Sequence, residues 1–261
     1  MNDSKTNVMD SAVIPEGLVV VIPSFNAAFT IGDLIDRIKN VVCREKILVV
    51  DDHSLDDTAA IAEAKGVSVI RHEKNLGYGG SQKTAIRWAI AEGSTMVAMI
   101  HGDAQYPPEM IPAGAISMDV SEIDLLLGNR IRSREECLSA RMPLLKYFAN
   151  RGLTVLQNIM TGQNLGEWHS GWRMYRTETA QKLPIDCYSD GFEFDTQFIL
   201  GVVGHGGVIG DVPVKPNYFK EASSISILRS SRYAIHAICC IAFWRIRKIL
   251  RLRSKFDCQP Y

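Results

Sequence analysis

The sequence predicts an α/β fold, with a mostly parallel central sheet and helices on both of its faces. Short apolar runs rich in Val and Ile alternate with segments in which apolar residues recur every three or four positions. The runs are apolar throughout, as expected of parallel strands that are buried on both faces. Acidic and polar residues directly follow several of the runs, at the edge of the sheet where such folds bind ligands.

The N-terminal half supports this prediction element by element. Leu18–Pro23 predicts the first strand, and a helix follows whose apolar positions share one face: Ile31, Leu34, Ile35 and Ile38. Three further runs predict strands of the same sheet: Ile47–Val50, Val67–Arg71 and Met96–Ile100. The glycine-bearing loop Asn75–Gly80 opens another helix before the last of these strands.

The second half is less regular. Asp124–Leu127 predicts a fifth strand, Leu144–Met160 a helix and Val208–Val214 a further strand. A polar patch, Glu167–Arg173, and an acidic segment, Asp190–Asp195, lie between them. Since no repeat or linker interrupts the chain, we expect one α/β domain over residues 1–228 and a basic amphipathic helix over 229–261.

Composition excludes several classes of protein. The chain has 261 residues, of which 46% are hydrophobic and 22% charged, as in an ordinary globular protein. Lys plus Arg equals Asp plus Glu, at 29 each, so the net charge indicates no particular partner. Basic residues are concentrated near the C-terminus and are not interleaved with aromatic residues along a sheet, which argues against nucleic-acid binding.

The cysteines and the first residues favour a cytoplasmic location. The six cysteines have no CxxC spacing, so we expect reduced thiols, most of them in the core. The first 16 residues are polar and contain no apolar stretch of the kind found in a secretory signal. No run reaches the roughly 18 apolar residues that a membrane-spanning helix requires.

Two groups of residues after the first two strands predict a nucleotide pocket. Pro23, Phe25 and Asn26 follow the first strand, and Asp51 and Asp52 follow the second. A carboxylate there can accept hydrogen bonds from a base or a ribose, and an aromatic ring can pack against the base. Aspartates in such loops also cap helices, so the structural alternative stays open.

Asp103 and Gln105 follow the fourth strand and predict a metal site. Side chains alternate along an extended segment, so these two oxygen donors point to one side. Mg2+ or Mn2+ needs few protein ligands where substrate phosphates supply the others. A cation held there would stabilise a leaving diphosphate.

Three basic residues are candidates for contacts with phosphate: Lys83, Arg130 and Arg173. The glycine loop itself matches neither the dinucleotide fingerprint nor the P-loop in spacing. Glu193 and Asp195 open an apolar helix, where the helix dipole alone would favour acidic residues. The functional alternative is that they are catalytic and face an acceptor.

Seven ordered motifs between about Leu18 and Ser226 resemble the inverting family-2 glycosyltransferases of GT-A fold. These motifs are VVIPSFNA, ILVVDDHSLDDT, NLGYGG, HGDAQYPPE, LLGNR, GEWHSGWRMYR and GFEFDTQ. The polyprenyl-phosphate and dolichyl-phosphate mannosyl- and glucosyltransferases are the most similar group. The resemblance implies a hexosyltransferase that uses a nucleotide diphosphate sugar, with Mg2+ or Mn2+, in the synthesis of cell-envelope glycans.

The resemblance also implies roles for individual residues. Arg130 would act catalytically on the donor diphosphate, together with the metal ligands Asp103 and Gln105. Three residues would surround the transferred sugar: Glu167, His169 and Ser170. Two positions depart from the common pattern, because Ala27 stands where many relatives have an acidic residue and His101 replaces the first aspartate of Asp-x-Asp-x-Gln.

The resemblance implies a lipid acceptor, and the C-terminal segment fits a membrane surface. Tyr233–Trp244 is apolar apart from His236, and alternating cations follow over Arg245–Arg253. A helix here would gather apolar residues on one face: Ile235, Cys239, Ala242, Ile246 and Ile249. Such a helix can lie in the interface of an anionic membrane, or it can pack on the core with a solvated basic end.

Three alternatives stay open. A sugar hydroxyl could be the acceptor, and catalysis would then require a base such as Asp190, Glu193 or Asp195. The chain could instead be a sugar-nucleotide-binding module without activity, for which the missing first aspartate argues. The sequence also leaves open which sugar is transferred and whether the protein is a homo-oligomer.

Overall fold

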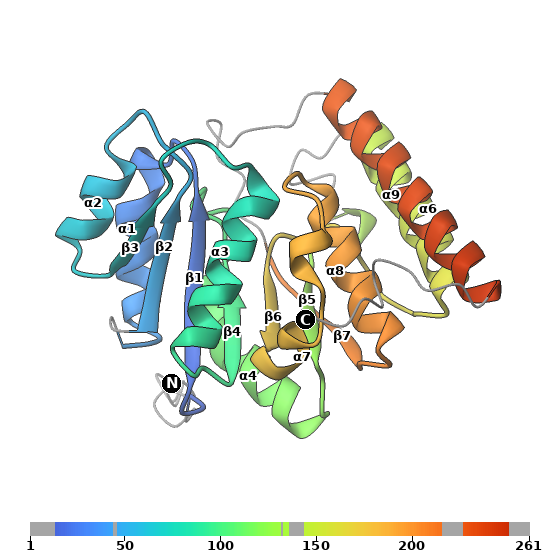
Figure 1. Cartoon of the computed structure of the whole chain (residues 1–261), viewed down its shortest axis with the longest axis horizontal. Helices are drawn as coiled ribbons and strands as arrows, with labels where there is room; N and C mark the ends of the chain where they lie inside the picture. The colour runs from blue at the N-terminus through green and yellow to red at the C-terminus, as the bar shows by residue number, and fades with distance from the viewer. Residues whose placement is uncertain (1–13, 44–45, 132, 136–143, 216–226, 251–261) are drawn as a thin grey trace, which may run out of the picture.

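The computed structural model describes residues 14–43, 46–131, 133–135, 144–215 and 227–250. A sheet of seven strands forms its centre, in the order β3-β2-β1-β4-β6-β5-β7 (Figure 1). The strands are β1 (Leu18–Ser24), β2 (Ile47–Asp51), β3 (Ser68–Arg71), β4 (Met96–Met99), β5 (Leu125–Asn129), β6 (Arg173–Arg176) and β7 (Ile209–Pro213). Only β6 runs antiparallel to its neighbours β4 and β5, so the predicted mostly parallel sheet is confirmed.

Helices cover both faces of this sheet. In chain order they are α1 (Ala28–Lys39), α2 (Thr58–Ala64), α3 (Tyr78–Ala91), α4 (Ile111–Val120), α6 (Leu144–Thr161), α7 (Thr177–Gln181), α8 (Glu193–Gly204) and α9 (Ile227–Ile249). Two short 3-10 helices, η3 (Pro108–Met110) and η4 (Ile185–Cys187), complete the described elements.

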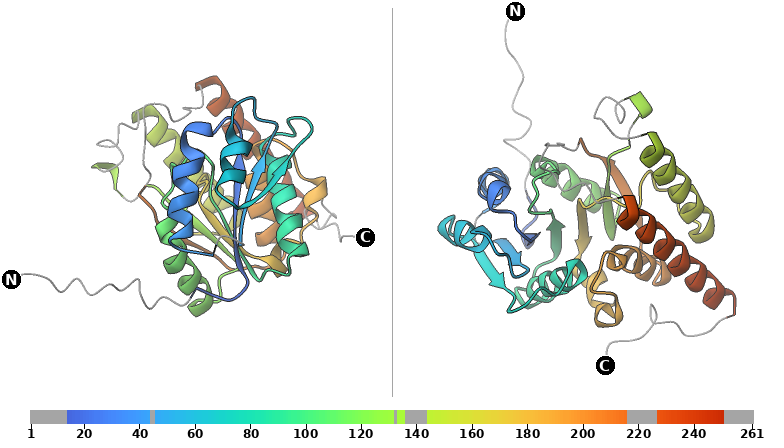
Figure 2. Two further views of the ribbon diagram at one scale, coloured as in Figure 1. Left: turned by 90° about the vertical axis from the view of Figure 1, so that its left-hand side faces the viewer. Right: turned by 90° about the horizontal axis from the view of Figure 1, so that it is seen from above.

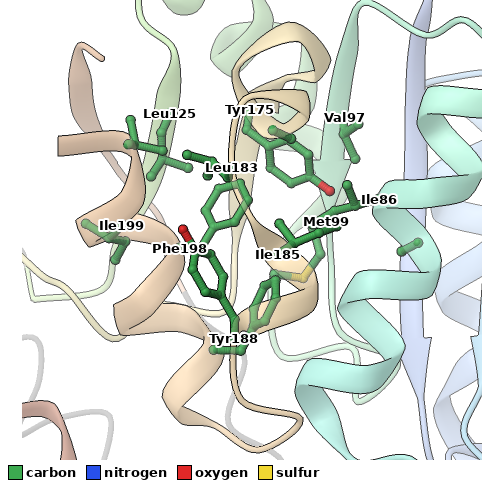
Figure 3. Close-up of a cluster of buried hydrophobic side chains, with 14 of the residues drawn as sticks. Ile86, Val97, Met99, Leu125, Tyr175, Leu183, Ile185, Tyr188, Phe198 and Ile199 are labelled. Carbon is green, nitrogen blue, oxygen red and sulfur yellow. The ribbon is translucent and has the colours of Figure 1, made fainter. Parts of the chain in front are cut away.

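The apolar strand runs supply two cores, one on each face. Along β1, Val19 and Val21 belong to one buried cluster, whereas Leu18, Val20 and Ile22 belong to the other. Because side chains alternate along a strand, both faces must be apolar, which is why the run is continuous. Figure 3 shows part of the first cluster, where Phe198 and Ile199 of α8 lie near Tyr175 of β6 and Leu125 of β5.

The predicted strands are confirmed to within one or two residues, but β6 was missed. Its sequence, RMYR, is short and begins and ends with arginine, so it carries no apolar run. Arg173 and Met174 are nevertheless buried between β4 and β5. The prediction that Glu167–Arg173 is simply a polar patch is therefore wrong at its C-terminal end, where Arg173 begins a central strand.

Helix α9 packs on the core with one face, and its place in a membrane interface stays a prediction. Ala237, Ile241 and Trp244 are buried, and the last two join the core that also contains α8. Its other apolar face is exposed, as the predicted pattern requires: Ile235, Cys239, Ile246 and Ile249. The domain boundary at residue 228 stays a prediction, and the cations Arg251, Arg253 and Lys255 lie outside the described residues.

None of the helices within the described ranges is long and apolar enough to cross a membrane. The four cysteines described are free thiols, as expected. The expectation that most cysteines lie in the core is wrong for Cys43, Cys187 and Cys239, which are exposed. Cys137 and Cys258 lie outside the described residues.

Candidate active site

The carboxyl ends of three neighbouring parallel strands bring the predicted nucleotide and metal residues to one edge of the sheet. Ser24 ends β1 and stands between the two groups. Its carbonyl accepts a hydrogen bond from the Asp52 amide (2.9 Å), and the carbonyl of Pro23 accepts one from the Gly102 amide (3.1 Å). A Cβ on Gly102 would lie 2.4 Å from Ser24 Oγ, so glycine permits this close approach.

Asp103 and Gln105 both lie in the turn that follows β4. Asp103 Oδ1 accepts a hydrogen bond from the Gln105 amide (3.1 Å), and both side chains are partly exposed. Ala104 between them has φ +54°, a strained conformation for a residue with a Cβ. Thr30 Oγ1 fixes the turn by donating to the Gly102 carbonyl (2.6 Å). A carboxylate and an amide oxygen held this way suit a hard divalent cation such as Mg2+ or Mn2+.

The loop after β1 is held by the motif that follows Asp52. Ser54 Oγ accepts from the Asn26 amide (2.9 Å), and Thr58 Oγ1 accepts from the Ala27 amide (2.8 Å). Asn26 has φ +50°, and its Oδ1 accepts from the Leu55 amide (2.9 Å). Phe25 is 51% exposed, which leaves its ring open to a ligand. Neither α1 nor α2 has a side-chain hydrogen bond at its N-cap, so Ser54 and Thr58 hold this loop rather than cap a helix.

The two aspartates predicted to bind the nucleotide are buried. Asp51 lies 3.2 Å from Arg71 Nε. Asp52 accepts hydrogen bonds from the Leu76 and Gly77 amides (2.7 and 2.9 Å) and lies 2.7 Å from His72 Nδ1. These contacts give Asp52 a structural task, which is to hold the glycine loop against the end of β2.

The glycine loop packs against the segment before α8 rather than around a phosphate. The Gly79 amide donates to the Asp190 carbonyl (2.7 Å), and a Cβ on Gly79 would lie 2.3 Å from the Ser189 carbonyl oxygen. Lys83 donates to the Tyr188 carbonyl (2.6 Å) and to Asp190 Oδ1 (2.7 Å). The ammonium group of Lys83 is therefore buried and bound to protein oxygens, and its predicted contact with a substrate phosphate stays a prediction.

Arg130 and Glu167 form an ion pair at the end of β5. The Glu167 side chain is fully buried, and the Arg130 side chain is 15% exposed. Arg130 donates to Glu167 from its amide and its Nε (both 2.9 Å) and to the His169 carbonyl from Nη2 (3.1 Å). Burial would raise the pKa of Glu167, but the Arg130 guanidinium holds it below its ordinary value. In this arrangement Glu167 orients Arg130, and its predicted place around the transferred sugar stays a prediction.

His169 and Ser170 lie beside this ion pair. Burial lowers the pKa of His169 to about 4, so its ring is neutral at pH 7. Ser170 is fully buried, and its Oγ accepts from the Trp172 amide (3.3 Å). The predicted sugar contacts of both residues stay predictions.

The carboxylates expected to face an acceptor are bound by side chains of other elements. Asp195 is buried and pairs with Arg173 through two contacts, of 2.7 and 2.6 Å. Burial raises the pKa of Asp195, and Arg173 opposes that effect. Glu193 lies 2.9 Å from His236 Nδ1 of α9. The predicted contacts of Asp195 with an acceptor and of Arg173 with phosphate stay predictions.

Two tyrosines that the sequence analysis did not single out connect these groups. Tyr78 Oη lies 2.9 Å from His101 Nε2 and 3.1 Å from Asp195 Oδ2. Tyr106 Oη accepts from the Gly171 amide (2.9 Å), and the Arg130 guanidinium lies 6.0 Å from its ring centroid. Both tyrosines stand inside recognised motifs, NLGYGG and HGDAQYPPE, which is the only signal the sequence offers.

The fold is an α/β fold whose predicted site residues follow the carboxyl ends of parallel strands, and comparison with known proteins identifies the family. Residues 19–183 match the model of glycosyl transferase family 2. The chain belongs to this family and is a glycosyltransferase of GT-A-like fold.

Three relatives illustrate the range of the family. An undecaprenyl-phosphate mannosyltransferase from Micrococcus luteus is 25% identical over 76% of this chain and 82% of its own. A UDP-N-acetylglucosamine–dolichyl-phosphate N-acetylglucosaminyltransferase from Methanococcus voltae is 24% identical over 77% of this chain and 86% of its own. The structure of glucosyl-3-phosphoglycerate synthase from Mycobacterium tuberculosis with Mn2+, UDP-glucose and phosphoglyceric acid has a TM-score of 0.68. It covers 94% of this chain and 84% of its own at 18% identity, so it supports the fold alone.

Proposed function

We propose that this glycosyltransferase moves a hexose from a nucleotide diphosphate sugar to a polyprenyl phosphate, with inversion at the anomeric carbon. The names of the relatives support a lipid phosphate acceptor and a nucleotide donor. Within the structure, the side-chain contacts of the acidic residues at the start of α8 support the same acceptor.

The single observation that carries this proposal is that each candidate base is bound by a side chain of another element. Asp190 pairs with Lys83, Asp195 with Arg173, and Glu193 with His236. A sugar hydroxyl acceptor would need one of them as a free base, because a hydroxyl must lose its proton as it attacks. A phosphate acceptor is already anionic at neutral pH, so it needs no base.

In the proposed reaction an oxygen of the lipid phosphate attacks the anomeric carbon as the bond to the donor diphosphate breaks. The nucleoside diphosphate leaves with the bonding electron pair, and no proton has to move. Asp103 and Gln105 would hold Mg2+ or Mn2+, which neutralises the charge on the leaving diphosphate when bound. Phe25 would pack against the base. The hydrogen bonds described above hold the loop after β1 and the turn after β4 in place, so catalysis would depend on positioning.

Sugar transfer to polyprenyl phosphate, compared with transfer to free oligosaccharides, tests the proposal. Purified protein with Mn2+ should label the lipid from one member of a panel of UDP- and GDP-sugars. Asp103→Ala should abolish transfer and Mn2+-dependent stabilisation by the matching nucleotide, because bound ligand stabilises the folded state by mass action. Asp186→Ala is the matched control, since Asp186 is an exposed aspartate that pairs with Arg87 far from the metal turn. Transfer to a sugar hydroxyl, or unchanged activity in Asp103→Ala, would refute the proposal.

The proposed acceptor resides in a membrane, and two neighbouring helices offer a surface for it. Helices α6 and α9 lie side by side at one end of the sheet (Figures 1 and 2). Large apolar side chains are exposed on both: Leu144, Phe148, Val155, Leu156 and Ile159 on α6, and Ile235, Ile238, Phe243, Ile246 and Ile249 on α9. Arg247 and Lys248 pack over Phe243 and Trp244. We propose that this face lies on the anionic cytoplasmic surface of a membrane as a peripheral attachment.

Sedimentation with anionic liposomes tests the membrane proposal. Ile159→Glu and Ile249→Glu should shift the protein to the supernatant, because each places a charge in the apolar face. Val120→Glu is the control, since Val120 is 79% exposed on α4 and belongs to neither helix. Equal sedimentation of all three variants would contradict the proposal.

A further inference from the structure

A buried polar chain joins the first residue of the metal turn to helix α8. Asp195 is 8% exposed, Gln82 2% and Arg173 2%. Around Asp195, Arg173 and Gln82 bind Oδ1 at 2.7 and 3.2 Å, and Tyr78 binds Oδ2 at 3.1 Å. Tyr78 continues to His101 Nε2 at 2.9 Å.

The direction of these hydrogen bonds follows from the chemistry of the groups. An ionised carboxylate only accepts, so the single hydroxyl proton of Tyr78 is donated to Asp195. The Tyr78 oxygen is then left to accept a hydrogen bond from His101 Nε2. Asp195 therefore determines the orientation of the His101 ring through Tyr78.

The His101 ring is also enclosed by its surroundings. A Cβ on Gly171 would lie 2.3 Å from Cε1 of the ring, and the rings of Tyr78 and Tyr106 meet it edge to face at 5.2 and 6.0 Å. His101 immediately precedes Gly102 and Asp103, and its carbonyl accepts from the Ala104 amide (3.3 Å). The strained turn at Ala104 is thus anchored at its start by a side chain that other elements hold.

We propose that Asp195, Tyr78 and His101 form a positioning relay that holds Asp103 and Gln105 in place for the cation. The relay joins three elements, since Asp195 lies in α8, Tyr78 in α3 and His101 just after β4. Loss of either hydrogen bond of Tyr78 would free the His101 ring from α8. The relay rests on the proposed metal site at Asp103 and Gln105.

Tyr78→Phe is the mildest test, because it removes one oxygen atom. With UDP or GDP as the nucleotide, whichever the wild type binds with Mn2+, the variant should weaken Mn2+ binding by about tenfold. The electron paramagnetic resonance signal of free Mn2+ measures this affinity without relying on turnover. Tyr175→Phe is the matched control: Tyr175 is buried, and its hydroxyl has no hydrogen-bond partner among the described residues. Equal Mn2+ affinities in the two variants would overturn the proposal.

A double-mutant cycle tests whether Tyr78 and Asp195 act through one connection. Tyr78→Phe and Asp195→Asn each break the relay, so each alone should weaken Mn2+ binding by about tenfold. The double variant should bind Mn2+ no more weakly than the weaker of the two single variants, because both changes break the same connection. Additive losses in Mn2+ affinity would overturn the relay.

Mn2+ binding by Asp103→Ala separates a failure of the relay from a failure of the proposed function. If Asp103→Ala binds Mn2+ as well as the wild type does, the metal site itself is refuted. If Asp103→Ala loses Mn2+ and the cycle is additive in Mn2+ affinity, the relay alone fails. Circular dichroism identifies any variant that does not fold, and Tyr78→Phe then still decides the question.

Discussion

Removing Glu167 should destabilise the protein far more than removing a typical surface carboxylate. Glu167→Ala leaves the Arg130 guanidinium, only 15% exposed, without the carboxylate it binds. Deleting one partner of a buried ion pair costs about 3–5 kcal/mol, because the remaining charge stays in a poorly solvated site. At about 2–4 °C per kcal/mol for a chain of this size, the melting temperature should fall by roughly 6–20 °C.

Urea unfolding followed by circular dichroism measures this free energy directly. Glu109→Ala is the matched control, since Glu109 pairs with Arg37 at 2.9 Å but the two side chains are 45% and 24% exposed. Exposed pairs contribute about 0–1 kcal/mol, so the control should change the free energy of unfolding by no more than that. Equal losses in the two variants would refute the argument that burial makes the Arg130–Glu167 pair important.

Two further predictions concern a close contact and a buried histidine. Gly79→Ala should cost about 1–3 kcal/mol of unfolding free energy, because its Cβ would lie 2.3 Å from a backbone carbonyl. Gly152→Ala, in α6 with open space around it, should instead gain up to about 1 kcal/mol; urea unfolding that gives both the same sign would contradict this. The pKa of His169 is about 4 in the folded state and 6.5 in the unfolded state, so the unfolded state takes up the proton first as pH falls. Stability should therefore decrease between pH 6.5 and 4, by about 3 kcal/mol in total, and His169→Gln should remove that part of the slope. A constant difference between variant and wild type across this range would refute the low pKa.

The sheet could be predicted because its strands are buried on both faces. Runs such as Leu18–Pro23 have no polar position, which excludes an amphipathic helix or a solvent-facing strand. Because Asp51 and Asp103 follow the ends of predicted strands, the sequence also placed them at one edge of the sheet, although their contacts could not be predicted. Strand β6 escaped prediction because its flanking arginines are satisfied by tertiary partners, among them Asp195 for Arg173.

Individual roles at the site could not be predicted, because they depend on partners far away in the chain. Lys83 binds Asp190, 107 residues later, and Tyr78 binds Asp195, 117 residues later. A lysine after a glycine loop has the same local appearance whether it meets a phosphate or a carboxylate. Only the packing of α3 against the segment before α8 decides between them.

That segment also explains why three acidic residues gather at the start of one helix. The helix dipole would favour Asp190, Glu193 and Asp195 there in any case. Each of them, however, binds a side chain from a different element: Lys83 of α3, His236 of α9 and Arg173 of β6. The start of α8 therefore connects the glycine loop, the proposed membrane helix and the strand beside the metal turn. A substitution at any one of these carboxylates should loosen one such connection while leaving the other two in place.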